Sequence, residues 1–161
     1  MRIGVVSDTH SKRLPEKMLN DFKAVDLILH LGDLSDLSVY KKFSEMKPTK
    51  SVCGNMEDEE LCSRFPRKEI LEIENCRIGM FHGEGPPKKV LESVKRVFKD
   101  DKVDVALFGH SHQPFNETME GVLYFNPGSP TDTVFAPYLS YGILEIKDGK
   151  VMDARIIKVG S

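Results

Sequence analysis

The chain of 161 residues is 40% hydrophobic and 30% charged, a composition typical of a globular protein rather than of a disordered or fibrous one. Its length is usual for one domain, so we expect residues 1–161 to form a single domain. The net charge of −2 provides no broad attraction to polyanions, and we therefore expect neither a nucleic-acid polymer nor a membrane as the main partner.

The first third of the chain alternates short apolar runs with helical patterns. The pattern predicts buried strands at Ile3–Val6, Val25–Leu31 and Lys50–Cys53, and helices at Leu14–Phe22 and Leu37–Met46. Such alternation favours parallel β-α-β units with right-handed crossovers. Each predicted strand runs into a polar loop, and in a parallel sheet such loops emerge at the same edge.

The remaining two thirds mix strands with one further helix. Two strands at Glu69–Ile73 and Arg77–His82 flank a predicted turn and form an antiparallel hairpin. A helical stripe follows at Lys88–Lys99, and then a strand at Val103–Phe108. Pro- and Gly-rich turns separate three last strands, at Val122–Phe125, Leu139–Ile146 and Val151–Val159.

The cysteines and the N-terminus bear on location. Cys53, Cys62 and Cys76 are odd in number and lack Cys-x-x-Cys spacing, so they predict reduced, buried thiols rather than a disulfide framework or a zinc ribbon. The apolar stretch near the N-terminus is far too short for a signal peptide or a membrane span. We therefore expect a cytoplasmic location by default.

Polar residues of metal-binding type gather where the predicted strands end. Four of the five histidines follow directly on such a strand, and two aspartates and one asparagine occupy the same kind of position. The predicted topology brings these side chains to one sheet edge. The seven candidates are Asp8, His10, Asp33, Asn55, His82, His110 and His112.

Imidazoles and carboxylates without thiolates suit divalent ions such as Mn²⁺, Fe²⁺, Co²⁺, Ni²⁺ or Zn²⁺. Seven ligands are too many for one tetrahedral ion, but they suffice for two ions roughly 3.5–4 Å apart that share one carboxylate, for which Asp33 is the candidate. Two such ions can activate a bridging water and offset charge on phosphoryl oxygens. The pattern therefore predicts a phosphoesterase whose nucleophile is a metal-bridging hydroxide.

Each motif alone has a simpler interpretation. An Asp or His after a strand is often only a loop cap, and Gly32-Asp33 or Gly54-Asn55 alone is typical of a turn. The inference therefore depends on the joint pattern. His30 lies inside an apolar run and is interpreted as a core histidine that can brace a ligand loop. The acidic run at residues 57–60 is interpreted as a helix N-terminus rather than a third metal site.

The order of these motifs closely resembles the calcineurin-like metallophosphoesterase superfamily over nearly the whole chain. The opening Ser7-Asp8-Thr9-His10 and the later Asn126-Pro127-Gly128-Ser129 are most similar to its compact bacterial and archaeal phosphodiesterase branch, which is related to the retromer subunit of the same fold. The resemblance implies a four-layer α/β/β/α sandwich, in which two mixed sheets pack face to face between helices.

The resemblance also implies how the ligands are shared between two divalent ions. The first ion would take Asp8, His10 and His112, the second would take Asn55, His82 and His110, and Asp33 would bridge them. In relatives the residue at the Asn55 position also orients the phosphate, so Asn55 and Asp33 are the expected catalytic residues. Manganese is the first candidate metal, with nickel, iron, cobalt and zinc as alternatives.

The sequence departs from the family near these ligands. Many phosphatase relatives carry a proton-donating His directly after the Gly-Asn pair, whereas this chain has Met56, so no general acid is identified. Glu57 or Asp58 could serve, or neither. Glu84 replaces a His common after the His82-Gly83 pair, which puts substrate contact and metal preference in doubt. Asn126-Pro127-Gly128-Ser129 is left open between a tight turn and a phosphate contact.

Several functions stay open at this stage. A small phosphate ester, either a diester or a monoester, is the expected substrate. A protein-binding scaffold that keeps the fold without catalysis is the alternative, and missing ligands would favour it, but none is missing. A nuclease is disfavoured because the chain has no basic stripe. Small relatives often form dimers, so a homodimer is possible, although the sequence has no interface signal.

Overall fold

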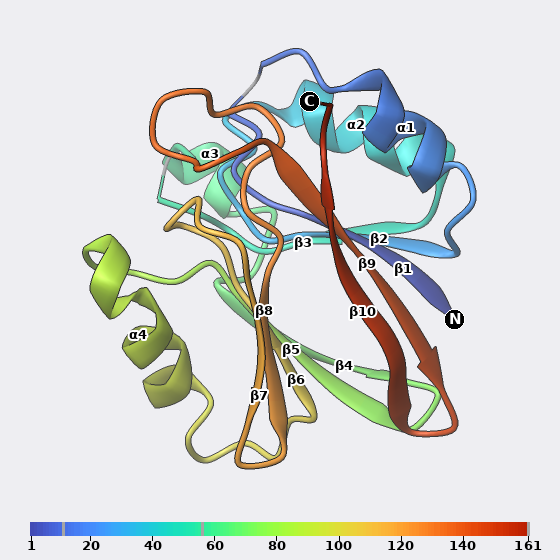
Figure 1. Ribbon diagram of the computed structural model, residues 1–161. Coiled ribbons are helices and arrows are strands. Elements are labelled where there is room, and N and C mark those ends of the chain that lie inside the picture. Colours follow the sequence, from blue (N-terminus) through green and yellow to red (C-terminus); the bar gives the residue numbers. More distant parts are fainter. Residues whose placement is uncertain (11, 56, 161) are drawn as a thin grey trace.

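Two five-stranded β-sheets face each other in the computed structural model, which describes residues 1–10, 12–55 and 57–160 (Figure 1). The first sheet has the order β10 (Lys150–Lys158), β9 (Ser140–Lys147), β1 (Arg2–Val6), β2 (Leu27–His30) and β3 (Thr49–Ser51). The second has the order β4 (Lys68–Ile73), β5 (Cys76–Phe81), β6 (Val105–Leu107), β8 (Val122–Asn126) and β7 (Phe115–Met119).

Helices cover the outer face of each sheet, as Figure 1 shows. Apolar side chains of α1 (Glu16–Phe22) and α2 (Leu37–Met46) pack on the first sheet. Those of α4 (Val90–Val97), which a short 3₁₀ turn η1 (Pro87–Lys89) precedes, pack on the second sheet. A third cluster, drawn from strands of both sheets, fills the space between them. The chain is therefore a four-layer α/β/β/α sandwich with two mixed sheets, and the expected fold is confirmed.

The parallel strand pairs direct the loops to one edge. β1 pairs in parallel with β2, and β2 with β3, as the alternating pattern predicts. In the second sheet β5 pairs in parallel with β6, and β6 with β8. The predicted hairpin of β4 and β5 is antiparallel and turns at Glu74 and Asn75, which both adopt a positive φ. Carboxyl ends of strands from both sheets consequently meet around one region.

Two expectations need correction. β7 was not predicted, because only its ends, Phe115 and Met119, are apolar, and it is held as an edge strand by pairing with β8. The expectation of reduced thiols is wrong for Cys53 and Cys62, which form a disulfide with a Cα–Cα distance of 5.2 Å. The pair meets because the short helix α3 (Glu59–Cys62) folds back toward the loop after β3, which no local spacing signals. Cys76 is free and buried, as expected.

None of the described helices has the length and apolar character that crossing a bilayer requires.

Phe125 on β8 provides a test of the core between the sheets. Its side chain is fully buried, and a Cβ at Gly142 of β9 would lie 2.7 Å from Phe125 Cζ, so the ring fills the space that this glycine leaves. Phe125→Ala should lower the free energy of unfolding by about 3–5 kcal/mol in urea denaturation, because it removes a large buried side chain and leaves a cavity. The matched variant Phe135→Ala alters a residue that is 75% exposed, and it should change the free energy of unfolding by less than about 0.5 kcal/mol. Equal losses would contradict this account of the core.

Candidate metal centre

The seven predicted ligand residues lie at the edge where the two sheets meet. Each is in a loop that directly follows a strand, so the short distance from a rigid strand end fixes its position. Asp8 and His10 follow β1, Asp33 follows β2, Asn55 follows β3, His82 follows β5, and His110 and His112 follow β6. The structure therefore brings together residues that are more than a hundred positions apart.

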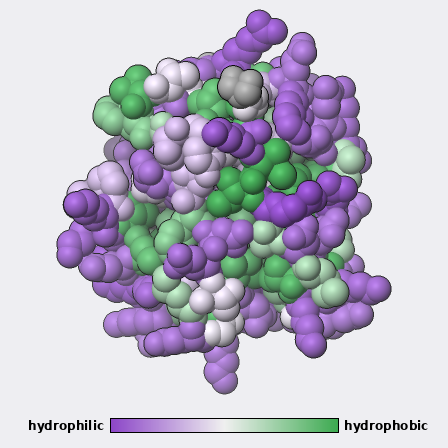
Figure 2. Space-filling view, in the orientation of Figure 1, coloured by the Kyte–Doolittle hydropathy of each residue, from purple (hydrophilic) through white to green (hydrophobic). Residues whose placement is uncertain are grey.

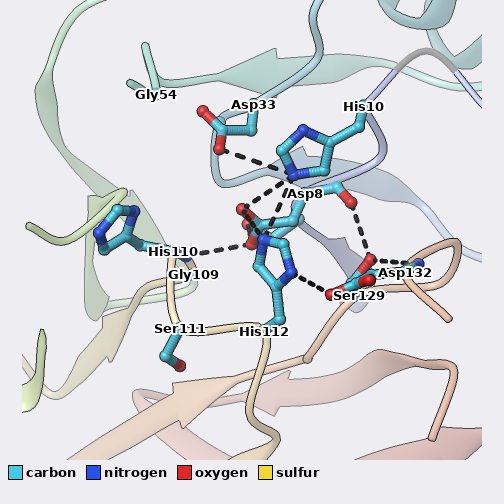
Figure 3. Close-up of polar contacts among 12 residues, drawn as sticks. Asp8, His10, Asp33, Gly54, Gly109, His110, Ser111, His112, Ser129 and Asp132 are labelled. Atoms are coloured by element: carbon cyan, nitrogen blue, oxygen red, sulfur yellow. Dashed lines mark hydrogen bonds and ion pairs between the residues drawn. The ribbon is translucent and has the colours of Figure 1, made fainter. Parts of the chain in front are cut away.

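Four of these side chains surround one point (Figure 3). Asp8, His10, Asp33 and His112 each offer one ligand atom, and the four atoms lie within 4.8 Å of one another. His112 Nε2 is 3.3 Å from both Asp8 Oδ1 and His10 Nε2. His10 Nε2 is 3.7 Å from Asp33 Oδ2. Two carboxylates and two imidazoles in this arrangement can hold a divalent cation.

A second group adjoins the first through Asp33. Asn55 Oδ1 lies 2.9 Å from His82 Nε2 and 3.1 Å from His110 Nδ1. His82 Nε2 is in turn 3.4 Å from Asp33 Oδ2, the same oxygen that faces His10. Asp33 thus lies between the two groups, where a bridging carboxylate would be needed.

The surroundings of Asp8 show that this donor set fits a cation. Asp8 Oδ1 is buried and has no hydrogen-bond partner among the described residues, yet three imidazole Nε2 atoms, of His112, His82 and His10, lie 3.3, 3.7 and 3.8 Å away. A carboxylate oxygen and imidazole nitrogens directed at a common point are what a divalent ion requires. The Asn55 amide adjoins His82, His110 and Asp33, and with its nitrogen turned toward them it donates hydrogen bonds to all three.

The backbone is strained where these ligands occur. Asp8, His10, Asp33, His110 and His112 have φ values of 57°, 48°, 60°, 69° and 59°, in the left-handed region that costs a non-glycine residue roughly 1 kcal/mol or more. Such strain typically clusters at functional sites and persists only where surrounding contacts enforce it. The irregular loop that was expected for the two histidines of residues 109–112 is thereby confirmed.

Hydrogen bonds from both sheets enforce these conformations. Asp8 Oδ2 accepts from Ser7 Oγ at 2.7 Å and from the backbone N of His110 at 3.0 Å, which joins the loop after β1 to the loop after β6. His30 is fully buried; its Nδ1 accepts from Gly32 N at 3.0 Å, and its Nε2 lies 3.1 Å from the Thr9 hydroxyl. Burial lowers the pKa of His30 to about 3, so it braces both loops as a neutral residue, in agreement with its predicted role.

The segment after β8 holds the same loops. Asn126 Nδ2 donates to Gly109 O at 3.2 Å and to Ser111 Oγ at 3.0 Å, and Ser129 Oγ donates to Asp8 O at 2.8 Å. Asn126 and Ser129 are both fully buried. Of the two alternatives left open for residues 126–129, this arrangement favours a structural turn over a phosphate contact.

The structure separates the carboxyl groups that were considered as acids. Glu57 accepts from Leu34 N at 2.7 Å and from Gly54 N at 3.0 Å, and burial raises the pKa of Glu57 to about 7. Asp58 accepts from Leu61 N and caps α3, as expected for the acidic run. Glu84 pairs with Arg96 of α4, at 3.3 Å, rather than with the ligands. Met56, the position where relatives carry a His, lies outside the described residues.

One carboxylate in contact with the ligands was missed altogether. Asp132 Oδ2 lies 2.5 Å from Nδ1 of His112, and Figure 3 places it beside Ser129 on the far side of that ring. Its only sequence signal is its position three residues after the Asn126–Ser129 turn, and a single sequence gives that position no chemical meaning.

The protonation of the centre is governed by the carboxylates around it. Burial by itself would lower the pKa values of His82 and His112, but nearby carboxylates raise both to about 9. Asp8 and Asp33 act on His82. Asp8 and Asp132 act on His112. His10 has a pKa below its ordinary value, because burial outweighs the attraction of Asp8 and Asp33. Burial would raise the pKa of Asp8, but His82 and His112 hold it well below its usual range.

Comparisons with known proteins agree with this geometry. The sequence model of a protein family, the calcineurin-like phosphoesterase superfamily domain, matches residues 1–149. A probable metallophosphoesterase of Methanothermobacter thermautotrophicus is 38% identical over 168 residues, which cover 100% of this chain and 94% of that protein. A phosphodiesterase of Methanocaldococcus jannaschii is 30% identical over 145 residues, or 80% of this chain and 83% of that protein. Vps29 from Chaetomium thermophilum, at 20% identity, shares the fold with a TM-score of 0.80 over 99% of this chain and 97% of its own.

The raised pKa values predict how stability depends on pH when no metal is bound. His82 and His112 have pKa values of about 9 in the folded chain and an ordinary value of 6.5 when unfolded, so their protonation stabilises the fold fully below pH 6.5. This contribution is lost as pH rises through 9. The melting temperature in excess chelator should therefore fall between pH 6.5 and 9.5, and His112→Gln should flatten the decline. A constant melting temperature over this range would contradict the assignment.

Proposed function

Because the chain belongs to the calcineurin-like phosphoesterase superfamily, we propose that it is a phosphodiesterase that works with two divalent metal ions. The observation that carries the proposal is the position of Asp33 between two groups of ligand atoms. Asp8, His10 and His112 would hold one ion, Asn55, His82 and His110 would hold the other, and Asp33 would contact both. Manganese is the first candidate for both positions.

The different burial of the ligand residues suggests how a phosphate would bind. Asp8, Asp33 and His82 are at most 2% exposed and form the floor of the centre, whereas Asn55 is exposed at its rim. The Asn55 amide is therefore placed to reach an oxygen of an incoming phosphate and orient it. Bound divalent ions supply the Lewis acidity that activates water and offsets charge on the phosphoryl oxygens.

Water is the proposed nucleophile because the hydroxyls around the centre are already engaged. Ser7 Oγ is buried and donates to Asp8, and Ser111 Oγ accepts from the Asn126 amide and from Gln113 N. Both side chains are also buried, so we propose a metal-bound water as the nucleophile in preference to either serine.

Charge favours a diester over a monoester. The ion pairs of Asp8 and Asp33 with His10, His82 and His112 lie within the group of ligands itself, so the positive charge that meets a phosphate would come mainly from the bound ions. A phosphodiester carries less negative charge than a monoester and needs less compensation in return. The likeness to the phosphodiesterase of M. jannaschii supports the same choice.

The scaffold alternative receives less support from the surface. The exposed large hydrophobic residues of the described chain are Met1, Val134, Phe135 and Met152, and hydrophilic atoms cover most of the face in Figure 2. Green, hydrophobic atoms appear in several groups on this face, one of them where Figure 1 shows the loop between β8 and β9, and purple atoms lie between and around them. Protein-binding surfaces usually present larger continuous apolar areas. We therefore retain hydrolysis as the proposed function.

Metal titration and a substituted bridge test the proposal. Calorimetric titration of metal-free protein with Mn²⁺ should give two ions per chain, and Mn²⁺ should start hydrolysis of a chromogenic phosphodiester. Asp33→Asn should lower kcat by at least about a hundredfold, because a neutral amide cannot bridge two cations. Asp100→Asn, in an exposed position, should leave kcat unchanged.

Activity should also be compared between a diester and the corresponding monoester, and kcat/KM should be higher for the diester. Saturation at one ion per chain, or inactivity toward every ester with each of the five candidate metals, would refute the proposal.

A further inference from the structure

The loop between β8 and β9 is tied to the backbone of the first ligand loop. Ser129 Oγ donates to Asp8 O at 2.8 Å, and Thr131 Oγ1 donates to Thr9 O at 2.9 Å. Ser129 Oγ also accepts from the backbone N of Asp132 at 3.0 Å. The position of Asp132 relative to Asp8 is therefore set by direct hydrogen bonds rather than by a free loop.

The carboxylate of Asp132 is itself held rigidly. The side chain is 5% exposed; Oδ1 accepts from Val134 N at 2.8 Å, and Oδ2 accepts from Ala136 N at 3.1 Å. The backbone N of Phe135 also lies within 3.2 Å of both oxygens. Donors therefore surround both oxygens, with Nδ1 of His112 and three backbone amides directed at them, so the carboxylate is held as a group that only accepts.

This anion determines which nitrogen of His112 carries a proton. Asp132 Oδ2 is 2.5 Å from Nδ1, a distance that requires a hydrogen between the two atoms. A divalent ion that displaces the proton of Nε2 would leave the proton of Nδ1 in place, so Nε2 is the ligand atom; it points at Asp8 Oδ1 and His10 Nε2, each 3.3 Å away. A ligating histidine held by a carboxylate in this way is fixed in tautomer and orientation and is more basic.

In the part of the chain that the structure describes, carbonyl oxygens rather than carboxylates contact the far ring nitrogens of the other two histidines. His82 Nδ1 lies 2.7 Å from Leu31 O, and His110 Nε2 lies 2.8 Å from Gly85 O. Both rings are oriented by neutral carbonyl oxygens, whereas His112 is oriented by a full negative charge. The two halves of the centre, alike in their number of ligands, therefore differ in the group that holds the far nitrogen of a ligating imidazole, which is a carboxylate in one half and carbonyl oxygens in the other.

We propose that Asp132 is a positioning residue that keeps the proton of His112 on Nδ1 and makes the half of the centre formed by Asp8, His10 and His112 the first to fill with a divalent ion. This inference rests on the two-ion centre of the proposed function and adds an order of binding to it. Asp132 touches neither ion nor substrate, since it acts through the ring of His112.

Substitution of Asp132 should change one binding step and not the other. In Asp132→Asn an NH₂ group can face Nδ1 and move the proton to Nε2, while the remaining oxygen still accepts from the loop amides. In calorimetric titration of the metal-free chain with Mn²⁺, the Kd of the first ion should rise about 10–100-fold. The Kd of the second ion should change by less than about threefold. Val134→Ala, at a side chain that is 74% exposed, should leave both values unchanged.

A second variant distinguishes the effect of the proton on His112 from the effect of the position of the loop between β8 and β9. Ser129→Ala removes the hydrogen bonds to Asp8 O and to Asp132 N but keeps the carboxylate. If Ser129→Ala raises the Kd of the first ion as much as Asp132→Asn does, the position of the loop alone is responsible and the proposal is overturned. Equal weakening of both ions in Asp132→Asn, or no weakening, would overturn it as well.

Unaltered protein gives an independent readout should Asp132→Asn fail to fold. In ¹⁵N-histidine NMR spectra of the chain with one equivalent of Cd²⁺, His112 should show a protonated Nδ1 and a metal-bound Nε2. A metal-bound Nδ1, or a first equivalent bound by His82 and His110, would overturn the proposal. Neither measurement involves hydrolysis, so a chain that binds ions in this order but cleaves no ester would refute the proposed function and leave this inference standing.

Discussion

The buried carboxylate of Asp8 is the constraint on which the centre depends. A charged group that is fully buried is costly unless other groups compensate it, and here the compensation comes from both sheets. One oxygen accepts from Ser7 of the first sheet's loop and from the backbone of His110 in the second sheet's loop. The other faces imidazoles of His10, His82 and His112. Separation of the two sheets at this edge would leave that charge uncompensated, so packing of the sheets and assembly of the ligands are one event.

Around this charge, rigid groups hold the ligands in conformations that they would not adopt by themselves. Five ligand residues occupy the left-handed region, and buried polar side chains fix the loops that carry them. His30 braces the loops after β1 and β2, Asn126 braces the loop after β6, and Glu57 links the loops after β2 and β3. Few of these groups can reach a substrate. They keep the ligand atoms in place before a cation arrives, which reduces the reorganisation that binding requires.

Fold and chemistry are separable in this architecture. Vps29 shares the fold at 20% identity, which is evidence about the fold alone, whereas a probable metallophosphoesterase of M. thermautotrophicus is 38% identical over 94% of its own length. The proposed hydrolysis depends instead on the set of ligand-type side chains on the loops, together with the carboxylate of Asp132 that contacts Nδ1 of His112. In that proposal the chemistry belongs to a few loop residues near Asp8.

The sequence alone was enough to predict most strands, the helices and all seven residues at the sheet edge, because each ligand directly follows an apolar run and parallel strands end on the same side. The second sheet came only from the family resemblance, and β7 was missed because only its two end residues are apolar, which leaves no alternating hydrophobic pattern. Only the tertiary structure could reveal the Cys53–Cys62 disulfide, the brace of Glu57 and the contact of Asp132 with His112. Such contacts depend on how loops fold over one another, and hydrophobic periodicity carries no information about the direction of a polar side chain in an irregular loop.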